Sequence, residues 1–208
     1  ATDFPTTPGA VQPTAGSRAC VGGLCADAFV TRLDASGSAL GYSTYLFGDF
    51  DEEGVGIAVD DSGRAYVVGT TNSSTFPLAH AFQRELRGSL DAFVTRLDPS
   101  GSSYEYSSFL GGGGGHGYIF EGEEEGLAIA VDGAGNAVVG GTSRSFDFWT
   151  SDDAYRRALT VGTCGYTDSL CADVFVTRIA PSGSGVTPAV RVSVDTARLP
   201  SGGTITAT

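Results

Sequence analysis

Internal repeats constrain the fold of this chain more than any other feature of its sequence. Three segments are nearly identical, namely DAFVTRLDASG at residues 27–37, DAFVTRLDPSG at 91–101 and DVFVTRIAPSG at 173–183. A second block occurs twice, as residues 53–71 and 125–143, which start 72 residues apart. Such self-similarity indicates that one supersecondary unit is repeated along the chain, so neighbouring units should bury each other's apolar faces.

The repeated blocks predict β-structure. In residues 56–69, two runs rich in Val, Ile, Ala and Tyr flank an Asp-Asp-Ser-Gly sequence, which is the composition of a tight hairpin. The DAFVTRL segments are almost continuously apolar or β-branched, as expected for strands that are covered on both faces. Aromatic-rich segments at 42–48 and 106–112 supply a fourth strand. Four antiparallel strands per repeat form the blade of a β-propeller, so the predicted fold class is all-β.

A third, looser block reads DFPTTPGAVQ at residues 3–12, TFPLAHAFQ at 75–83 and DFWTSDDAYR at 147–156. The three blocks in this order resemble the SBBP repeat, a bacterial β-propeller repeat family, over roughly residues 1–183. The resemblance implies a secreted or surface-exposed propeller module with no activity generally attached to it. The last copy departs from the pattern, because Ala180 replaces the Asp of the other two turns. The predicted organisation is a half blade at 1–52, blades at 53–124 and 125–185, and a C-terminal β tail at 186–208.

Two and a half blades cannot close a ring, because propellers typically have about 4 to 8 blades. The open sheet edges therefore need a cover. Residues 203–208 alternate like a strand and could pair with the half blade of a neighbouring copy, through Thr204, Ile205 and Thr206. Head-to-tail contacts of this kind build fibres. The alternative is that the chain, whose Ala1 suggests processing or truncation, is a slice of a longer propeller protein with its tail leading into an Ig-like domain.

The predicted function is that of a non-enzymatic extracellular structural module, a filament or surface-layer subunit that binds other copies of itself. The alternative is a ligand-binding propeller domain of a larger secreted adhesin-like protein, which recognises surface carbohydrate or protein. A net charge of −12 and the absence of Lys disfavour nucleic acid as a partner. No apolar run approaches the ~20 residues of a membrane helix, so membrane insertion is not expected. No GxSxG elbow occurs and no catalytic residues are assigned.

The four cysteines predict two local disulfides, because each pair directly precedes a copy of the recurring strand. The pairs are Cys20 with Cys25 and Cys164 with Cys171. Disulfides indicate an oxidising compartment. A four-cysteine zinc site is the less favoured alternative, because two different repeats would have to converge on one metal ion.

An acidic run precedes each hairpin block. Carboxylates this close repel one another unless they are solvated, paired with Arg or bridged by a hard cation, so Ca²⁺ is a candidate cofactor. The recurring Arg32, Arg96 and Arg178 are expected to pair with Glu53 and Glu125 or with turn Asp residues. The candidate ligands are Asp49, Asp51, Glu52, Glu53, Glu121, Glu123, Glu124 and Glu125.

Overall fold

A computed structural model of the chain describes residues 3–16, 19–20, 23–113, 122–152, 154, 172–180 and 189–194. Within these residues the chain forms β-strands and no helix, which confirms the all-β prediction. Among the same residues, no helix is long and apolar enough to cross a membrane.

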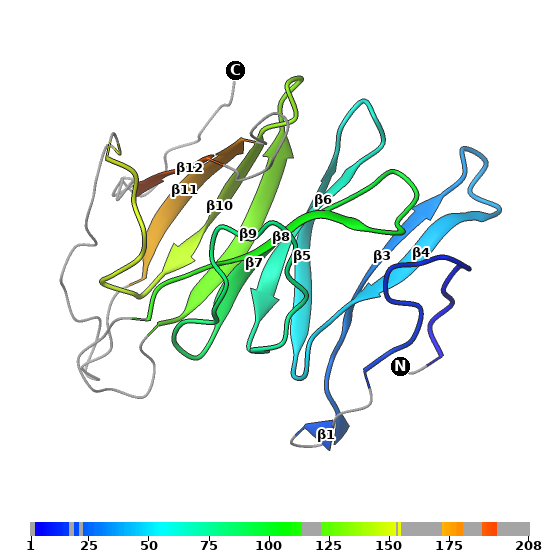
Figure 1. Ribbon diagram of the computed structural model, residues 1–208, viewed down its shortest axis with the longest axis horizontal. Helices are drawn as coiled ribbons and strands as arrows, with labels where there is room; N and C mark the ends of the chain where they lie inside the picture. Colours follow the sequence, from blue (N-terminus) through cyan, green and yellow to red (C-terminus); the bar gives the residue numbers. More distant parts are fainter. Residues whose placement is uncertain are drawn as a thin grey trace, which may run out of the picture.

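The strands that follow residue 27 form three antiparallel sheets that stand side by side (Figure 1), and a short two-stranded sheet precedes them. A two-stranded sheet lies on one side, a four-stranded sheet occupies the middle and a second four-stranded sheet lies on the other side. The first contains β3 (Ala28–Leu33) and β4 (Leu40–Leu46). The second has the order β5 (Glu52–Val59), β6 (Ala65–Thr71), β7 (Asp91–Leu97) and β8 (Tyr104–Leu110). The third contains β9 (Glu124–Val131), β10 (Ala137–Ser143), β11 (Asp173–Ala180) and β12 (Ala189–Val194).

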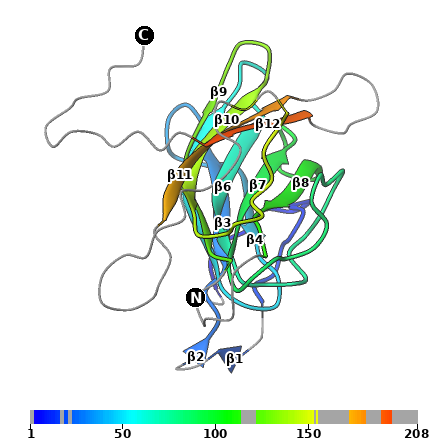
Figure 2. The ribbon, with the colours of Figure 1, turned by 90° about the vertical axis from the view of Figure 1, so that its left-hand side faces the viewer.

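The two four-stranded sheets are repeats of one blade, and the two-stranded sheet is the outer half of another. The recurring DAFVTRL segments form β3, β7 and β11, and each pairs with the strand that follows it in its sheet. Figure 2 looks from the side of the β9–β12 sheet. There β12, which lies in the segment assigned to the tail, pairs with β11 from Phe175↔Val194 to Ala180↔Ala189. Part of residues 186–208 therefore forms the fourth strand of the last blade.

The strand β7 packs against both neighbouring sheets. Its Ala92 and Val94 belong to a core cluster shared with the β9–β12 sheet. Its Phe93 and Leu97 belong to a second cluster shared with β3 and β4. Successive side chains of a strand point to opposite faces, so a central blade needs apolar residues at consecutive positions. This explains the nearly continuous apolar run of the DAFVTRL motif.

The first two copies of the third sequence block cover the outer edges of their blades. Ala79 and Ser107 of β8 exchange two backbone hydrogen bonds, at 3.1 and 2.7 Å. At the equivalent place, the Thr7 amide donates to the carbonyl oxygen of Ser43 in β4 at 3.0 Å. These contacts satisfy the backbone groups of outer strands that would otherwise lie at an open edge.

Candidate functional site

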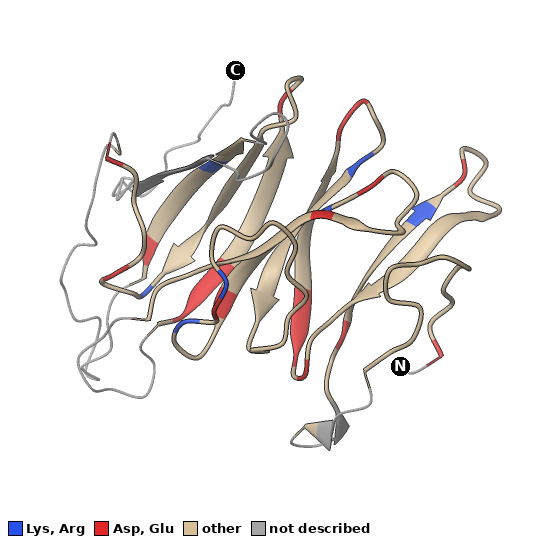
Figure 3. Cartoon of the chain, in the orientation of Figure 1, with Lys and Arg blue, Asp and Glu red and all other residues tan. Residues whose placement is uncertain are grey.

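The two acidic runs lie at the beginnings of β5 and β9, on one side of the array (Figure 3). Their members are related by the 72-residue period, so that Glu52 corresponds to Glu124 and Glu53 to Glu125. The structure gives the members of each run different environments, which the sequence alone did not distinguish.

Glu52 and Glu124 are buried carboxylates that bind within the protein. Glu52 accepts hydrogen bonds from the Gly48 amide at 2.9 Å and from the Thr71 hydroxyl at 2.7 Å. Glu124 accepts the same pair of bonds, from the Gly112 amide at 2.8 Å and the Ser143 hydroxyl at 2.6 Å. Burial raises the pKa of both groups, that of Glu124 to about 6. Each carboxylate joins the end of one sheet to the start of the next, which is a structural role.

The neighbouring acidic residues also have partners in the protein. Asp51 accepts a hydrogen bond from the Ala26 amide at 2.7 Å. Glu123 forms an ion pair with Arg144 at 3.1 Å. Glu125 accepts a bond from the Thr142 hydroxyl at 3.3 Å. The remaining two candidate ligands are Asp49 and Glu121. Asp49 is half-buried, and Glu121 lies outside the described residues.

A groove of about 690 Å³ lies where the two acidic runs approach each other. Glu53 and Glu125 line it together with Asp51 and Glu52, and the rest of its wall combines the polar Thr70 and Asn72 with four apolar residues. Such a surface can bind a cationic ligand or one with many hydroxyl groups, and its apolar residues can add contacts. The groove is lined by Ala26, Asp51, Glu52, Glu53, Val55, Thr70, Asn72, Leu90, Glu125 and Leu127.

Over the described ranges, a single group of three metal-binding side chains has its ligand atoms within 4.8 Å of one another, and it consists of Cys20, Cys25 and Asp51. The two cysteines of this group are joined in a disulfide and are not thiolate ligands. The acidic runs supply no such cluster among those residues. Calcium binding by these carboxylates therefore stays a prediction.

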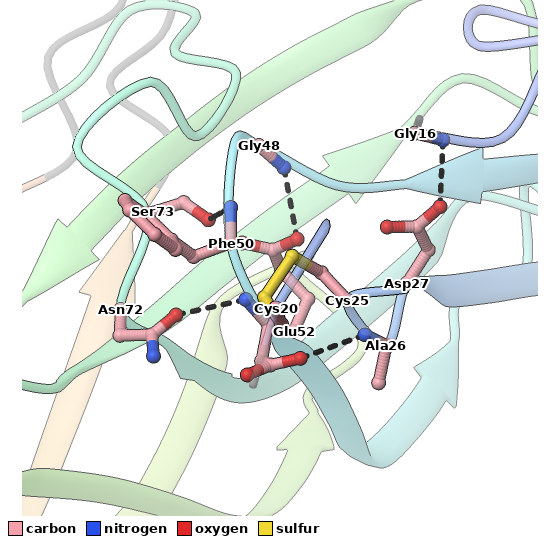
Figure 4. Close-up of a disulfide and its surroundings, with 11 residues drawn as sticks. Gly16, Cys20, Cys25, Ala26, Asp27, Gly48, Phe50, Glu52, Asn72 and Ser73 are labelled. Carbon is pink, nitrogen blue, oxygen red and sulfur yellow. Dashed lines mark hydrogen bonds between the residues drawn. A yellow bond between two sulfur atoms is a disulfide. The ribbon is translucent and has the colours of Figure 1, made fainter. Parts of the chain in front are cut away.

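The disulfide between Cys20 and Cys25 closes the short hairpin of β1 (Ala19–Cys20) and β2 (Gly23–Leu24), with its Cα atoms 4.9 Å apart. Figure 4 shows this hairpin beside Asp27 and Glu52. The Gly16 amide donates to the Asp27 carboxylate at 2.7 Å, on the N-terminal side of the hairpin. The disulfide therefore anchors the loop that leads into β3. The predicted partners Cys164 and Cys171 lie outside the described residues, as do Thr204, Ile205 and Thr206.

Asp91, the first residue of β7, is fully buried and was not among the predicted site residues. One of its carboxylate oxygens accepts hydrogen bonds from the Gln83 side chain at 2.7 Å and from the Arg87 amide at 3.0 Å. Burial raises the pKa of Asp91 to about 8, and the nearby charge of Glu124 acts in the same direction. The sequence does contain a signal for Asp91, because an Asp begins all three copies of the repeated strand motif.

Arg96 has a different partner from the one predicted. It forms an ion pair with Glu105 at 2.7 Å, and Glu105 also binds Arg64 at 2.9 Å. Its guanidinium lies 4.9 Å from the ring centre of Tyr106 and 5.7 Å from that of Tyr66. The expected pairing with the acidic runs is wrong here, because Arg96 pairs in register with Tyr106 near the far end of the strand.

The other two arginines also avoid Glu53 and Glu125. Arg32 donates to the carbonyl oxygen of Pro99 at 3.1 Å. Arg178 pairs with Asp132 at 3.4 Å, which confirms the alternative of a turn aspartate as its partner. The acidic runs begin β5 and β9, whereas these arginines lie near the ends of their strands, so the antiparallel register separates the two sets.

Comparison with protein families identifies the repeat. Residues 42–77 match the SBBP family, a beta-propeller repeat. This stretch runs from β4 through the β5–β6 hairpin to Pro77, and so links two successive blades. The chain therefore contains an SBBP-type repeat. No curated protein matches its sequence.

The SBBP match covers part of the groove and of the buried network described above. Glu52, Glu53 and Asn72 lie inside it, and Glu124, Glu125 and Asp91 lie beyond it. The 72-residue period relates Glu124 to Glu52 and Glu125 to Glu53, so the blade junction of the SBBP repeat recurs outside the matched segment. The exposed Trp149 also lies beyond the match.

Proposed function

We propose that this chain is a non-enzymatic, extracellular structural module that assembles with other copies of itself through its incomplete propeller. One observation carries the proposal. Within the described residues, β3 pairs with β4 alone, whereas the equivalent β7 is flanked by both β6 and β8. The half blade therefore leaves room for two more strands beside β3. A strand edge of this kind is a ready template for strand addition.

Two further observations support an extracellular structural role. The Cys20–Cys25 disulfide is of a type that persists in oxidising compartments. The carboxylates Glu52 and Glu124 are engaged in joining successive sheets, so the most prominent acidic residues serve the scaffold. A filament or surface-layer subunit is the specific form that we propose for the assembly.

The test is the mass of the purified 208-residue chain in solution, measured by light scattering over a range of concentrations, with negative-stain electron microscopy of the same samples. We expect species larger than the monomer, and regular fibres at high concentration. A chain that stays monomeric at all concentrations would refute the proposal. Deletion of residues 203–208 tests the narrower idea that the tail donates the missing strand, because fibres should then disappear.

The acidic groove favours a second candidate function, which is ligand binding. A groove of about 690 Å³ falls in the size range of ligand sites, and Glu53 and Glu125 face it with apolar neighbours. A glycan array and a panel of basic peptides would identify a ligand. Replacing Glu53 and Glu125 by Gln should weaken such binding, whereas Glu85→Gln, at an exposed site away from the groove, should not.

A further inference from the structure

The two outermost blades each present an exposed apolar face whose counterpart inside the molecule is buried. Phe29 and Leu33 of β3 are each 55% exposed, whereas their equivalents in β7, Phe93 and Leu97, are fully buried. These two residues define the N-terminal face. They point away from β7, because Ala28 and Val30, the alternate residues, pack in the core shared with the middle sheet.

The last blade presents the opposite side of the same motif. Val174 and Val176 of β11 are 49% and 36% exposed, and their equivalents in β7, Ala92 and Val94, are fully buried. We call this surface, together with Arg178, the C-terminal face. It lies on the side of the β9–β12 sheet that faces away from β5–β8, because Phe175 and Ile179 occupy the core between these sheets.

The two faces are the two halves of one interface that the chain already forms internally. Between the half blade and the middle sheet, Ala28 and Val30 of one blade pack with Phe93 and Leu97 of the next. The C-terminal face carries residues of the Ala28 and Val30 type, and the N-terminal face carries residues of the Phe93 and Leu97 type. They are complementary in the sense in which two successive blades of this repeat are complementary.

The internal interface also contains a polar contact, and the residues equivalent to its two partners are exposed on the two outer faces. Arg32 of the half blade donates to the carbonyl oxygen of Pro99 in the turn of the next blade. Its equivalent on the C-terminal face is Arg178, and the equivalent of Pro99 on the N-terminal face is Ala35. Arg178 has a side chain that is 47% exposed, and Ala35 lies in an exposed turn beside the carboxylate of Asp34.

The same turn shows an unfilled position. Gly101, in the turn of the middle blade, packs against the ring of Tyr42 from the preceding blade, whereas its equivalent Gly37 has no atom within 4 Å of where a Cβ would lie. The N-terminal face thus has the same contact surface that the middle blade uses to pack against the half blade. On the N-terminal face this surface is exposed to solvent.

We infer that the C-terminal face of one copy packs on the N-terminal face of a second copy of this chain, as one blade packs on the next. This inference rests on the proposed self-assembly and specifies its interface. Contact is between sheet faces, through Val174 and Val176 against Phe29 and Leu33. Arg178 reaches the carbonyl oxygen of Ala35. Because the two faces differ, the contact is head-to-tail and adds copies in one direction.

The test uses one charged substitution on each face. Phe29→Asp blocks the N-terminal face and Val176→Asp blocks the C-terminal face, and each leaves the other face intact. Either variant alone should lose assembly beyond the monomer, with its association constant reduced at least tenfold. Mixed in equal amounts, the two variants should form a discrete 1:1 dimer that does not grow further. Ile57→Asp is the matched control, because Ile57 is equally exposed but lies on β5, away from both faces.

The outcomes separate the inference from the proposed function. If the wild-type chain is monomeric, both are refuted. If the wild-type chain assembles and the two single variants assemble equally well, face packing is wrong while self-assembly stands, and strand donation by residues 203–208 becomes the explanation. Circular dichroism of each variant shows whether it is folded, and the mixed dimer requires both to be folded.

Discussion

The buried carboxyl group of Asp91 should make the stability of the protein fall as the pH rises. Its pKa is about 8 in the folded protein against an ordinary value of 3.8, because burial disfavours the charged form. A group with a raised pKa in the folded state contributes its full stability below its unfolded pKa, and this contribution is lost as pH rises through the folded value. A shift of about 4 units, at ~1.4 kcal/mol per unit, sets an upper limit of about 6 kcal/mol.

Replacement of Asp91 by Asn tests this reasoning. Asn cannot ionise, and its side-chain oxygen can still accept the bonds from Gln83 and Arg87. The free energy of unfolding, measured by urea denaturation from pH 5 to pH 9, should fall more for the wild type than for Asp91→Asn. The difference between the two proteins isolates Asp91 from the other titrating groups, and it should change by several kcal/mol over this range.

A matched control has the opposite sign. Hydrogen bonds from Asn136 lower the pKa of Asp132, in an exposed hairpin turn, to about 2. Asp132→Asn should therefore destabilise the protein near neutral pH, and this effect should fade as the pH falls from 4 to 2. If the difference between wild type and Asp91→Asn is constant from pH 5 to pH 9, the account of Asp91 is wrong.

Three further perturbations have definite expected outcomes. Gly141→Ala should destabilise the protein by at least ~2 kcal/mol in thermal or urea unfolding, because the new Cβ would overlap the Glu125 carbonyl and the Phe175 ring. The adjacent Gly140→Ala is the control and should change the free energy of unfolding by less than ~0.5 kcal/mol, because its Cβ would meet nothing within 4 Å. Equal effects of the two substitutions would contradict the packing described. Arg96→Ala should lower the free energy of unfolding by about 2–3 kcal/mol in the same assay, because it removes the ion pair and the two aromatic contacts of a largely buried side chain. An unchanged free energy of unfolding would mean that this network contributes little to stability. Replacing Cys20 and Cys25 together by Ala should lower the free energy of unfolding by about 2 kcal/mol, the value expected for a small disulfide loop. An unchanged melting temperature would show that the loop is anchored without the disulfide.

The structure of a single blade could be predicted from the sequence. The alternation of apolar, β-branched and turn residues predicted the strands, and the recurrence of the DAFVTRL motif predicted that one sheet is repeated. Gly63 and Gly135 adopt positive φ in the two hairpin turns, at 81° and 78°, as the Asp-Ser-Gly and Gly-Ala-Gly sequences indicated. These features depend on local preferences and on side-chain periodicity, which a sequence displays directly. The tight cysteine spacing likewise indicated the disulfide of the first copy.

The environment of each charged residue, in contrast, depends on the tertiary fold. The adjacent residues Glu52 and Glu53 cannot be told apart in the sequence. In the structure Glu52 is buried and its carboxylate accepts a hydrogen bond from Thr71, whereas Glu53 is exposed. The partner of Arg96 depends on the register of β7 against β8, which brings Glu105 near it across nine positions of sequence. Burial and the packing of distant segments set these contacts, and neither is encoded in the spacing of residues along one strand.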